Sequence, residues 1–362
     1  MSENVDIRQA SNVLVRSTNW VGDAVLTLPA LRALRGALPR ARVTVLARPW
    51  VSAIFEREPA VDRVLIYPSR SNLLGMRTGW WRMGRSLRGE HFDAALLFQN
   101  AFEAALIARL AAIPLRAGYA REGRGFLLTH AAPVPHAGEI PAHECYYYLE
   151  LLRRLGLIAE LPPVRHILLA EPPSRQAARE KLAAITGISV RSAPVVGLSP
   201  GAAFGTAKRW LPGRYAEVGR ALVGDGARIV LFGSQSESEL AGRIAGEIGP
   251  AARSLAGRTT LAEFIDTVAA CDLFLTNDSG AMHLAAAAGV PVLAVFGPTD
   301  ERGTAPLGPG ARILRKQVEC APCKLRECPI DHRCMTGVDT AGVLAVAREM
   351  LQSSVPGAAQ LL

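Results

Sequence analysis

Asp23, in the stretch NWVGDAVLTLPAL, is the first side chain of this 362-residue chain that could do chemistry. It follows a short apolar run, NVLVRS (12–17), and opens a helical pattern, so it stands at a strand–helix junction where Gly22 lets the backbone turn closely. An aspartate there can cap the helix. It can also act as a general base, if a substrate proton lies within hydrogen-bond reach. Spacing alone favours the cap.

Lys208 is the second candidate, in the glycine-containing stretch SPGAAFGTAKRWLP. The preceding run, PVVGLSPG (194–201), predicts a strand that leads into this loop. A lysine on such a loop can neutralise a phosphate as a point charge, with Thr206 beside it. The GxxxxGK[ST] spacing of a Walker loop is absent, and an exposed loop lysine is the simpler interpretation of Lys208 alone.

The third candidate is a group of four residues in TNDSGAMHLAAAAGVPVLAVFGPTD: Asp278, Ser279, Gly280 and His283. The uncharged part of this stretch is long enough to cross a bilayer, but the GVP sequence at 289–291 interrupts it. The pattern instead predicts strand, loop, helix, turn and strand. Amide groups at a helix start bind anions, and a hydroxyl can add to them. A lone histidine there could equally belong to the core.

Two series of alternating strands and helices must position these side chains. The alternation predicts α/β domains with parallel sheets, and two such sheets facing each other leave a cleft at their carboxyl edges, where ligands bind. Proline pairs near residue 172 suggest a linker, so we expect domains over residues 1–172 and 173–362. The stretch TAGVLAVAREMLQ (340–352) predicts a final helix.

The net charge of +9 is uneven along the chain. Residues 1–175 hold 22 arginines and no lysine against 15 acids, which gives +7. This excess favours an anionic partner, which could be a phosphorylated lipid or nucleic acid, although a solvated basic surface is an equal alternative. The N-terminal sequence lacks the pattern of a signal peptide, so a cytoplasmic location is expected.

Four cysteines lie close together near the end of the chain, with spacing C-x2-C-x4-C-x5-C: Cys320, Cys323, Cys328 and Cys334. This spacing is compatible with a structural zinc site. We favour a local structural or acceptor-side loop over a bound metal. No two aspartates stand in a DxD arrangement that could carry a metal for a diphosphate.

Together and in this order, the three stretches resemble the lipopolysaccharide heptosyltransferases of glycosyltransferase family 9. RSTNWVGDAVLTLPALRAL and CAPCKLRECPIDHRCM are most similar to the heptosyltransferase II branch. The resemblance implies a GT-B fold of two Rossmann-like domains, with the acceptor bound by the first and ADP-heptose by the second. It implies inverting transfer of heptose to the heptose-Kdo2-lipid A inner core, without a metal or other cofactor. It also implies a monomer at the cytoplasmic face of the inner membrane, and no nucleic-acid partner.

The resemblance also assigns roles to individual residues. Asp23 becomes the general base, and Lys208 the cation for the diphosphate leaving group. The donor-binding residues it implies are Thr206, Glu237, Thr259, Asp278, Ser279, Gly280 and His283. The arginines expected at a phosphorylated acceptor include Arg77, Arg82, Arg121 and Arg124.

Two other functions stay open at this point. The chain could be another family 9 enzyme with a different sugar or acceptor. It could also be a nucleotide-sugar-binding protein or an epimerase of the same two-domain plan. A binding protein would not need Asp23 as a base, so the effect of replacing Asp23 distinguishes the classes.

Overall fold

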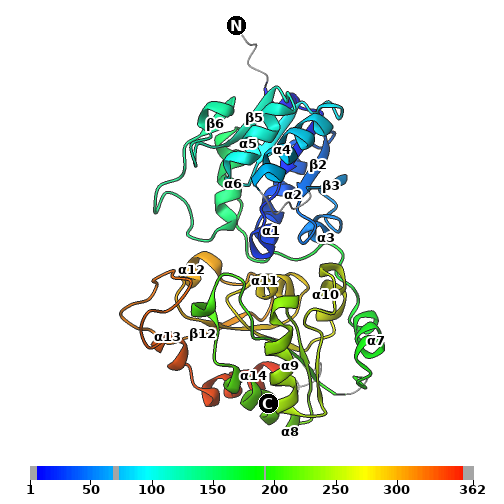
Figure 1. The fold of residues 1–362 in the computed structure, drawn as a ribbon, viewed down its shortest axis with the longest axis vertical. Coiled ribbons are helices and arrows are strands. Elements are labelled where there is room, and N and C mark those ends of the chain that lie inside the picture. Colours follow the sequence, from blue (N-terminus) through cyan, green and yellow to red (C-terminus); the bar gives the residue numbers. More distant parts are fainter. Residues whose placement is uncertain (1–5, 68–72, 191–192, 354–362) are drawn as a thin grey trace. The chain divides into compact units, whose positions relative to one another are not determined.

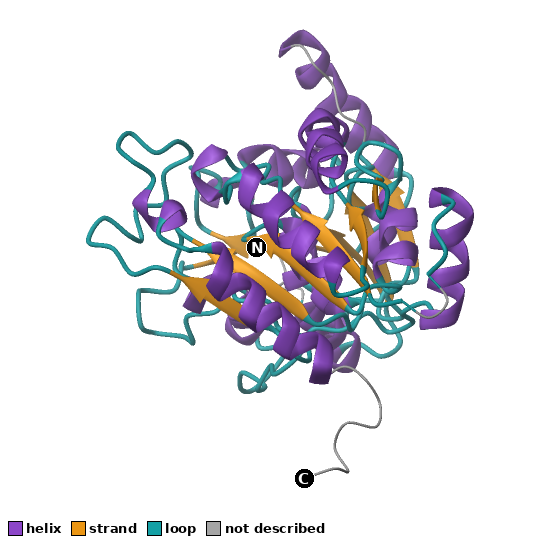
Figure 2. Ribbon diagram, turned by 90° about the horizontal axis from the view of Figure 1, so that it is seen from below, coloured by secondary structure: helices purple, strands orange, loops and turns teal. Residues whose placement is uncertain are grey.

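The computed structural model describes residues 6–67, 73–190 and 193–353, and of residues 73–77 the backbone alone. The chain divides into two compact units, Met1–Val164 and Arg165–Leu362. Each unit is an α/β domain built on a parallel sheet with helices on its faces (Figures 1 and 2). Within the described parts of the chain, no helix is both long and apolar enough to cross a membrane.

The sheet of the first unit has the strand order β3-β2-β1-β4-β5-β6, and every pairing is parallel. Its strands are β1 (Asn12–Arg16), β2 (Arg42–Ala47), β3 (Arg63–Ile66), β4 (Ala94–Leu97), β5 (Leu115–Tyr119) and β6 (His130–Ala132). The central strands are buried apolar runs, as expected for a sheet covered on both faces. The connecting helices are η1 (Ile7–Gln9), α1 (Val21–Leu26), α2 (Leu28–Ala37), α3 (Ser52–Phe55), α4 (Leu73–Arg88), α5 (Phe102–Leu110), η2 (Gly125–Leu127) and α6 (Cys145–Arg154).

The second unit repeats this plan with the order β12-β11-β10-β7-β8-β9. Its strands are β7 (Val195–Ser199), β8 (Arg228–Leu231), β9 (Ala252–Ser254), β10 (Leu273–Asn277), β11 (Val292–Phe296) and β12 (Arg312–Arg315). Its helices are α7 (Arg175–Thr186), η3 (Thr206–Lys208), α8 (Pro212–Gly224), η4 (Gln235–Glu237), α9 (Ser238–Ile248), α10 (Leu261–Val268), α11 (Gly280–Ala287), α12 (Glu301–Thr304), α13 (Arg333–Thr336) and α14 (Thr340–Ser353). The predicted final helix is therefore confirmed.

The strand order reverses at one point in each sheet, between β1 and β4 in the first unit and between β7 and β10 in the second. In open α/β sheets, ligands bind outside the carboxyl ends of the strands at such a reversal. Asp23 follows β1, Lys208 follows β7, and Asp278 follows β10. The predicted fold class of two parallel-sheet domains is confirmed, and each candidate follows a strand that borders such a reversal.

The boundary between the units lies eight residues before the expected position, after Val164 rather than after residue 172. The amide of Ile167 donates to the carbonyl of Leu307 at 2.8 Å, and that of Leu169 donates to the carbonyl of Ala287 at 2.8 Å. The segment before the proline pair is therefore already bound to the second unit, which composition alone does not reveal.

Candidate active site

Lys208 and Asp278 meet at the reversal point of the second sheet. Lys208 Nζ lies 2.5 Å from Asp278 Oδ2, and the hydroxyl of Thr299 donates to the same oxygen at 2.7 Å. The two charged side chains are only 13% and 4% exposed. The ammonium also lies 5.0 Å from the centroid of the Phe204 ring, within reach of a cation–π attraction. The loops after β7, β10 and β11 thus meet at one buried ion pair.

Asn277 holds two of these loops in register. Its side-chain oxygen accepts from the amide of Trp210 at 2.9 Å, and its amide group donates to the carbonyls of Pro200 and Gly201 at 2.8 and 3.1 Å. Because Asn277 is fully buried, these bonds are shielded from water. Sequence reasoning missed Asn277 and Thr299, since an asparagine at the end of a strand and a threonine in a loop have no distinguishing spacing.

Helix α11 begins directly beside this centre. Ser279 is its N-cap residue in extended conformation, and the Ser279 side chain makes no cap hydrogen bond. The Ser279 hydroxyl lies 3.3 Å from that of Thr276. Gly280 opens the helix, and His283 is buried on its first turn. An uncapped helix start next to a lysine is a suitable place for an anionic group.

Glu237 connects the neighbouring loops. Its Oε2 accepts from the amide and the hydroxyl of Ser234 at 2.7 and 2.8 Å, which caps η4. Its Oε1 lies so close to Gly201 that any Cβ at position 201 would overlap it. Thr206 opens η3, and Thr259 precedes the N-cap residue of α10. Both threonines therefore lie in connections that follow parallel strands of this sheet, but their expected contacts with a donor stay predictions.

The segment with the four cysteines packs against the Lys208 loop. The carbonyl of Arg326 accepts from the amide of Ala207 at 3.0 Å, and the ring Nε2 of His332 lies 2.7 Å from the carbonyl of Ala207. A Cβ at Gly205 would overlap the Arg326 backbone. All four cysteines are free thiols, and no group of three or more His, Cys, Asp or Glu side chains in the described ranges is arranged to hold a metal ion. In this structure the segment supports the loop that carries Lys208.

Asp23 is the third residue of α1 and is partly exposed. Trp20 is the N-cap residue, and its side chain makes no cap hydrogen bond. Asp23 is therefore not the N-cap residue that its spacing allowed, although an acid in the first turn still interacts favourably with the helix dipole. Burial raises the pKa of the Tyr148 hydroxyl, and the nearby Asp23 carboxylate raises that pKa further.

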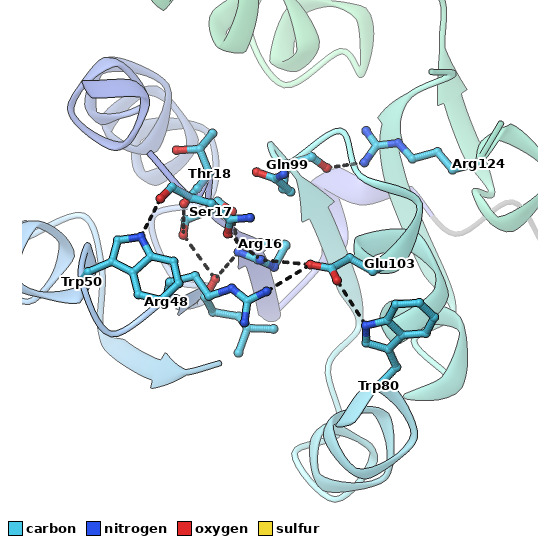
Figure 3. A network of polar contacts seen from close by, with 11 residues as sticks. Arg16, Ser17, Thr18, Arg48, Trp50, Trp80, Gln99, Glu103 and Arg124 are labelled. Atoms are coloured by element: carbon cyan, nitrogen blue, oxygen red, sulfur yellow. Dashed lines mark hydrogen bonds and ion pairs between the residues drawn. The ribbon is translucent and has the colours of Figure 1, made fainter. Parts of the chain in front are cut away.

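A buried ion-pair network stabilises the loop that leads to Asp23 (Figure 3). Arg16 donates to the carbonyl of Ser17 at 2.6 Å and to the side chain of Asn19 at 2.9 Å, and its guanidinium lies 3.8 Å from Glu103. Arg48 reaches the same carboxylate at 3.4 Å. Burial lowers the pKa of Arg16 to about 10. The network ties the ends of β1 and β2 to α5, and no spacing in the sequence predicts it.

The four arginines expected at the acceptor occupy different environments. Arg82 on α4 and Arg121 after β5 are exposed, and Arg121 lies 3.6 Å from Glu122. The side chain of Arg77 lies outside the described residues. Arg124 is fully buried, so the expectation of an exposed phosphate contact is wrong for this residue.

Arg124 instead joins three segments of the first unit. It donates to the carbonyls of Tyr119 at 3.0 Å and Gln99, and to the side chain of Asn100 at 3.0 Å (Figure 3 shows the bond to Gln99). Burial lowers its pKa to about 10. This arginine links β5 to the loop after β4.

Comparison with known proteins identifies the class of protein that carries this site. The chain belongs to glycosyltransferase family 9 (heptosyltransferase), whose family model matches residues 80–333. The family membership expected from the sequence is confirmed, and with it the assignment as a glycosyltransferase.

Individual relatives narrow the similarity further. The chain is 34% identical over 310 residues to lipopolysaccharide heptosyltransferase 2 of Salmonella typhimurium, covering 84% of this chain and 87% of the relative. It is 31% identical to lipooligosaccharide heptosyltransferase 2 of Haemophilus influenzae, covering 84% and 88%. The solved structure of Escherichia coli ADP-heptose LPS heptosyltransferase II superposes with a TM-score of 0.80 at 29% identity, covering 94% of this chain and 99% of that chain.

Proposed function

We propose that this protein transfers L-glycero-D-manno-heptose from ADP-heptose to the heptose-Kdo2-lipid A inner core of lipopolysaccharide. The observation that carries the proposal is the Lys208–Asp278–Thr299 centre beside the start of α11, in a chain of family 9. Further support comes from the similarity to proteins named lipopolysaccharide heptosyltransferase 2 and to a solved ADP-heptose heptosyltransferase.

The second unit would bind the donor. Lys208 and the amides at the start of α11 would face the diphosphate, with the Ser279 hydroxyl as a further donor. Asp278 and Thr299 would hold the ammonium of Lys208 in place, and Asn277 would fix the loop that carries it. These groups are preorganised before the reaction and meet negative charge as it develops on the departing ADP. The proposal includes no divalent metal: the Lys208 ammonium and the amide groups at the start of α11 would be the groups that meet the diphosphate.

Asp23 would act as the general base in a single displacement with inversion. The acceptor hydroxyl oxygen attacks the anomeric carbon of heptose, and its proton moves to the Asp23 carboxylate. The bond between the anomeric carbon and the phosphate oxygen breaks, and its electron pair leaves with ADP. The Arg16–Glu103 network would hold the loop before Asp23 in one conformation. The acceptor is lipid-borne and phosphorylated, so the exposed Arg82 and Arg121 suit contact with it at a membrane surface.

Replacing Asp23 with asparagine tests this assignment. Turnover should fall by roughly 10²–10⁴-fold, the usual contribution of a general base. ADP binding by the second unit should be unchanged when measured by calorimetry. Glu56→Gln removes an exposed carboxylate from the same unit and serves as the matched control, which should keep full turnover. Near-normal turnover of Asp23→Asn would instead assign Asp23 to stabilising the start of α1.

A further inference from the structure

Among the described residues of the first unit, five large aromatic side chains are exposed, and three of them belong to α4, α5 and η2. Trp81 of α4 is 66% exposed, Phe102 of α5 is 39% exposed, and Phe126 of η2 is 77% exposed. The rings of Phe102 and Phe126 are in contact, with centroids 6.1 Å apart. Single exposed apolar residues are common, but neighbouring exposed aromatic rings indicate a binding surface.

Helices α4 and α5 lie side by side on one face of the sheet (Figure 1), and they pack closely. Gly84 permits this approach, because a Cβ there would lie 2.5 Å from the Cβ of Leu110. The indole of Trp80 donates to Glu103 at 3.1 Å across the same contact, and Arg88 donates to the carbonyl of Leu110 at 2.8 Å. The two helices therefore form one continuous outer surface.

The same spacing repeats on both helices. Trp81, Arg85 and Arg88 of α4 are separated by four and three residues, so they lie on one side of the helix, and all three are exposed. Phe102, Leu106 and Arg109 of α5 have the same spacing, with Phe102 and Arg109 exposed. Each helix thus places an aromatic ring about two turns before an exposed arginine.

The charge of this surface is positive. The sequence of α4, residues 73–88, contains four arginines and no acid. The acid of α5, Glu103, is engaged with Trp80, Arg16 and Arg48 rather than directed to solvent. One exposed acid, Glu122, lies on the loop before η2, and its carboxylate is 3.6 Å from Arg121. Aromatic rings next to an excess of arginines are the composition of a surface that lies in the interface of an anionic bilayer.

We propose that the outer face of α4 and α5, together with η2, binds an anionic lipid bilayer, and we call it the α4–α5 face. Trp81, Phe102 and Phe126 enter the headgroup region, and the arginines contact lipid phosphates. This inference rests on the proposed function in one respect. The contact with the bilayer is the one by which the enzyme would reach an acceptor embedded in a membrane.

Vesicle co-sedimentation of the full chain tests the inference without any sugar substrate. Wild-type protein should bind vesicles of phosphatidylethanolamine and phosphatidylglycerol more tightly than vesicles of phosphatidylcholine. The double variant Trp81→Ser/Phe126→Ser should bind the anionic vesicles at least about tenfold more weakly. Arg85→Gln/Arg109→Gln should weaken binding at low salt by about fivefold per arginine, and the effect should shrink at high salt.

The matched control removes exposed apolar residues from the second unit. Leu325→Ser/Ile330→Ser changes side chains that are also largely exposed, and it should bind vesicles like the wild type. Equal binding by the aromatic variant and this control would overturn the inference. A wild-type dimer in light scattering that Trp81→Ser/Phe126→Ser dissociates would also overturn it, because the face would then bind a second copy.

A transfer assay on a delipidated, water-soluble acceptor distinguishes this inference from the proposed function. Trp81→Ser/Phe126→Ser should keep wild-type transfer to that acceptor while losing vesicle binding. If wild-type protein binds anionic vesicles but transfers no heptose, the proposed function fails and the lipid-binding face stands. If it transfers heptose but binds no vesicles, the reverse holds.

Discussion

Replacing Lys208 with methionine should destabilise the second unit as well as slow the reaction. The substitution removes the cation beside the Asp278 carboxylate, which is 4% exposed, and leaves the Thr299 hydroxyl as a donor at 2.7 Å. Removing one partner of a buried ion pair lowers the free energy of unfolding by about 3–5 kcal/mol. Because the Thr299 hydroxyl still donates to Asp278, we expect a loss of about 3 kcal/mol for Lys208→Met. For a unit of this size the melting temperature should fall by about 6–12 °C, which calorimetry of the ligand-free protein would detect.

A second variant separates stability from chemistry. Lys208→Met/Asp278→Asn removes both charges, so most of the lost stability should return. Turnover should stay roughly 10²–10³-fold below wild type, because the charge that meets the departing diphosphate is still missing. Lys181→Met is the matched control, since Lys181 and Asp266 form a more exposed pair at 2.6 Å. Its effect on stability should be below about 1 kcal/mol.

Two results would refute this reasoning. An unchanged melting temperature for Lys208→Met would mean that the buried contact with Asp278 does not stabilise the fold. Recovery of turnover by the double variant would mean that Lys208 acts by neutralising Asp278 and not by meeting the donor diphosphate.

The remaining predictions concern three other parts of the molecule. Arg82→Ala and Arg121→Ala should raise the KM for the acceptor, leave the KM for ADP-heptose unchanged and lose their effect at high salt. A changed KM for ADP-heptose in these two variants would reverse the domain assignment. Arg124→Met should instead lower the melting temperature, because it leaves buried carbonyls unpaired. Exhaustive EDTA treatment should leave transfer intact. If EDTA abolished transfer and magnesium restored it, metal-independent transfer would be contradicted. If zinc alone restored it, the result would point to the cysteine segment. Asn277→Ala should weaken ADP affinity by about tenfold through the loss of two or more buried hydrogen bonds, and unchanged calorimetric affinity would contradict its positioning role.

The strand and helix pattern predicted the fold because the relevant signals are local. Alternating apolar runs and helical periods identified parallel-sheet domains, and the loops with Lys208 and Asp278 follow directly from strand ends. The contact between those two side chains joins residues 70 positions apart, so it depends on the strand order of the sheet.

The features that the sequence did not predict are set by long-range contacts. Arg124 has the sequence environment of an exposed loop arginine, but its guanidinium donates to carbonyls of Leu97, the last residue of β4, and of Gln99 after it. The domain boundary lies earlier than predicted because the amides of Ile167 and Leu169 donate to carbonyls of the second unit. The side-chain amide of Asn277 donates to a backbone carbonyl of the loop after β7, and a single sequence does not show that this loop lies beside Asn277.

A transfer assay with purified wild-type protein tests the central claim most directly. ADP-heptose would be supplied with a panel of truncated lipopolysaccharide acceptors, and the products would be identified by mass spectrometry and NMR. We predict transfer of one heptose to heptose-Kdo2-lipid A, with inversion at the anomeric carbon and none to Kdo2-lipid A. Transfer only to Kdo2-lipid A, or release of ADP without any glycosylated product, would contradict the account.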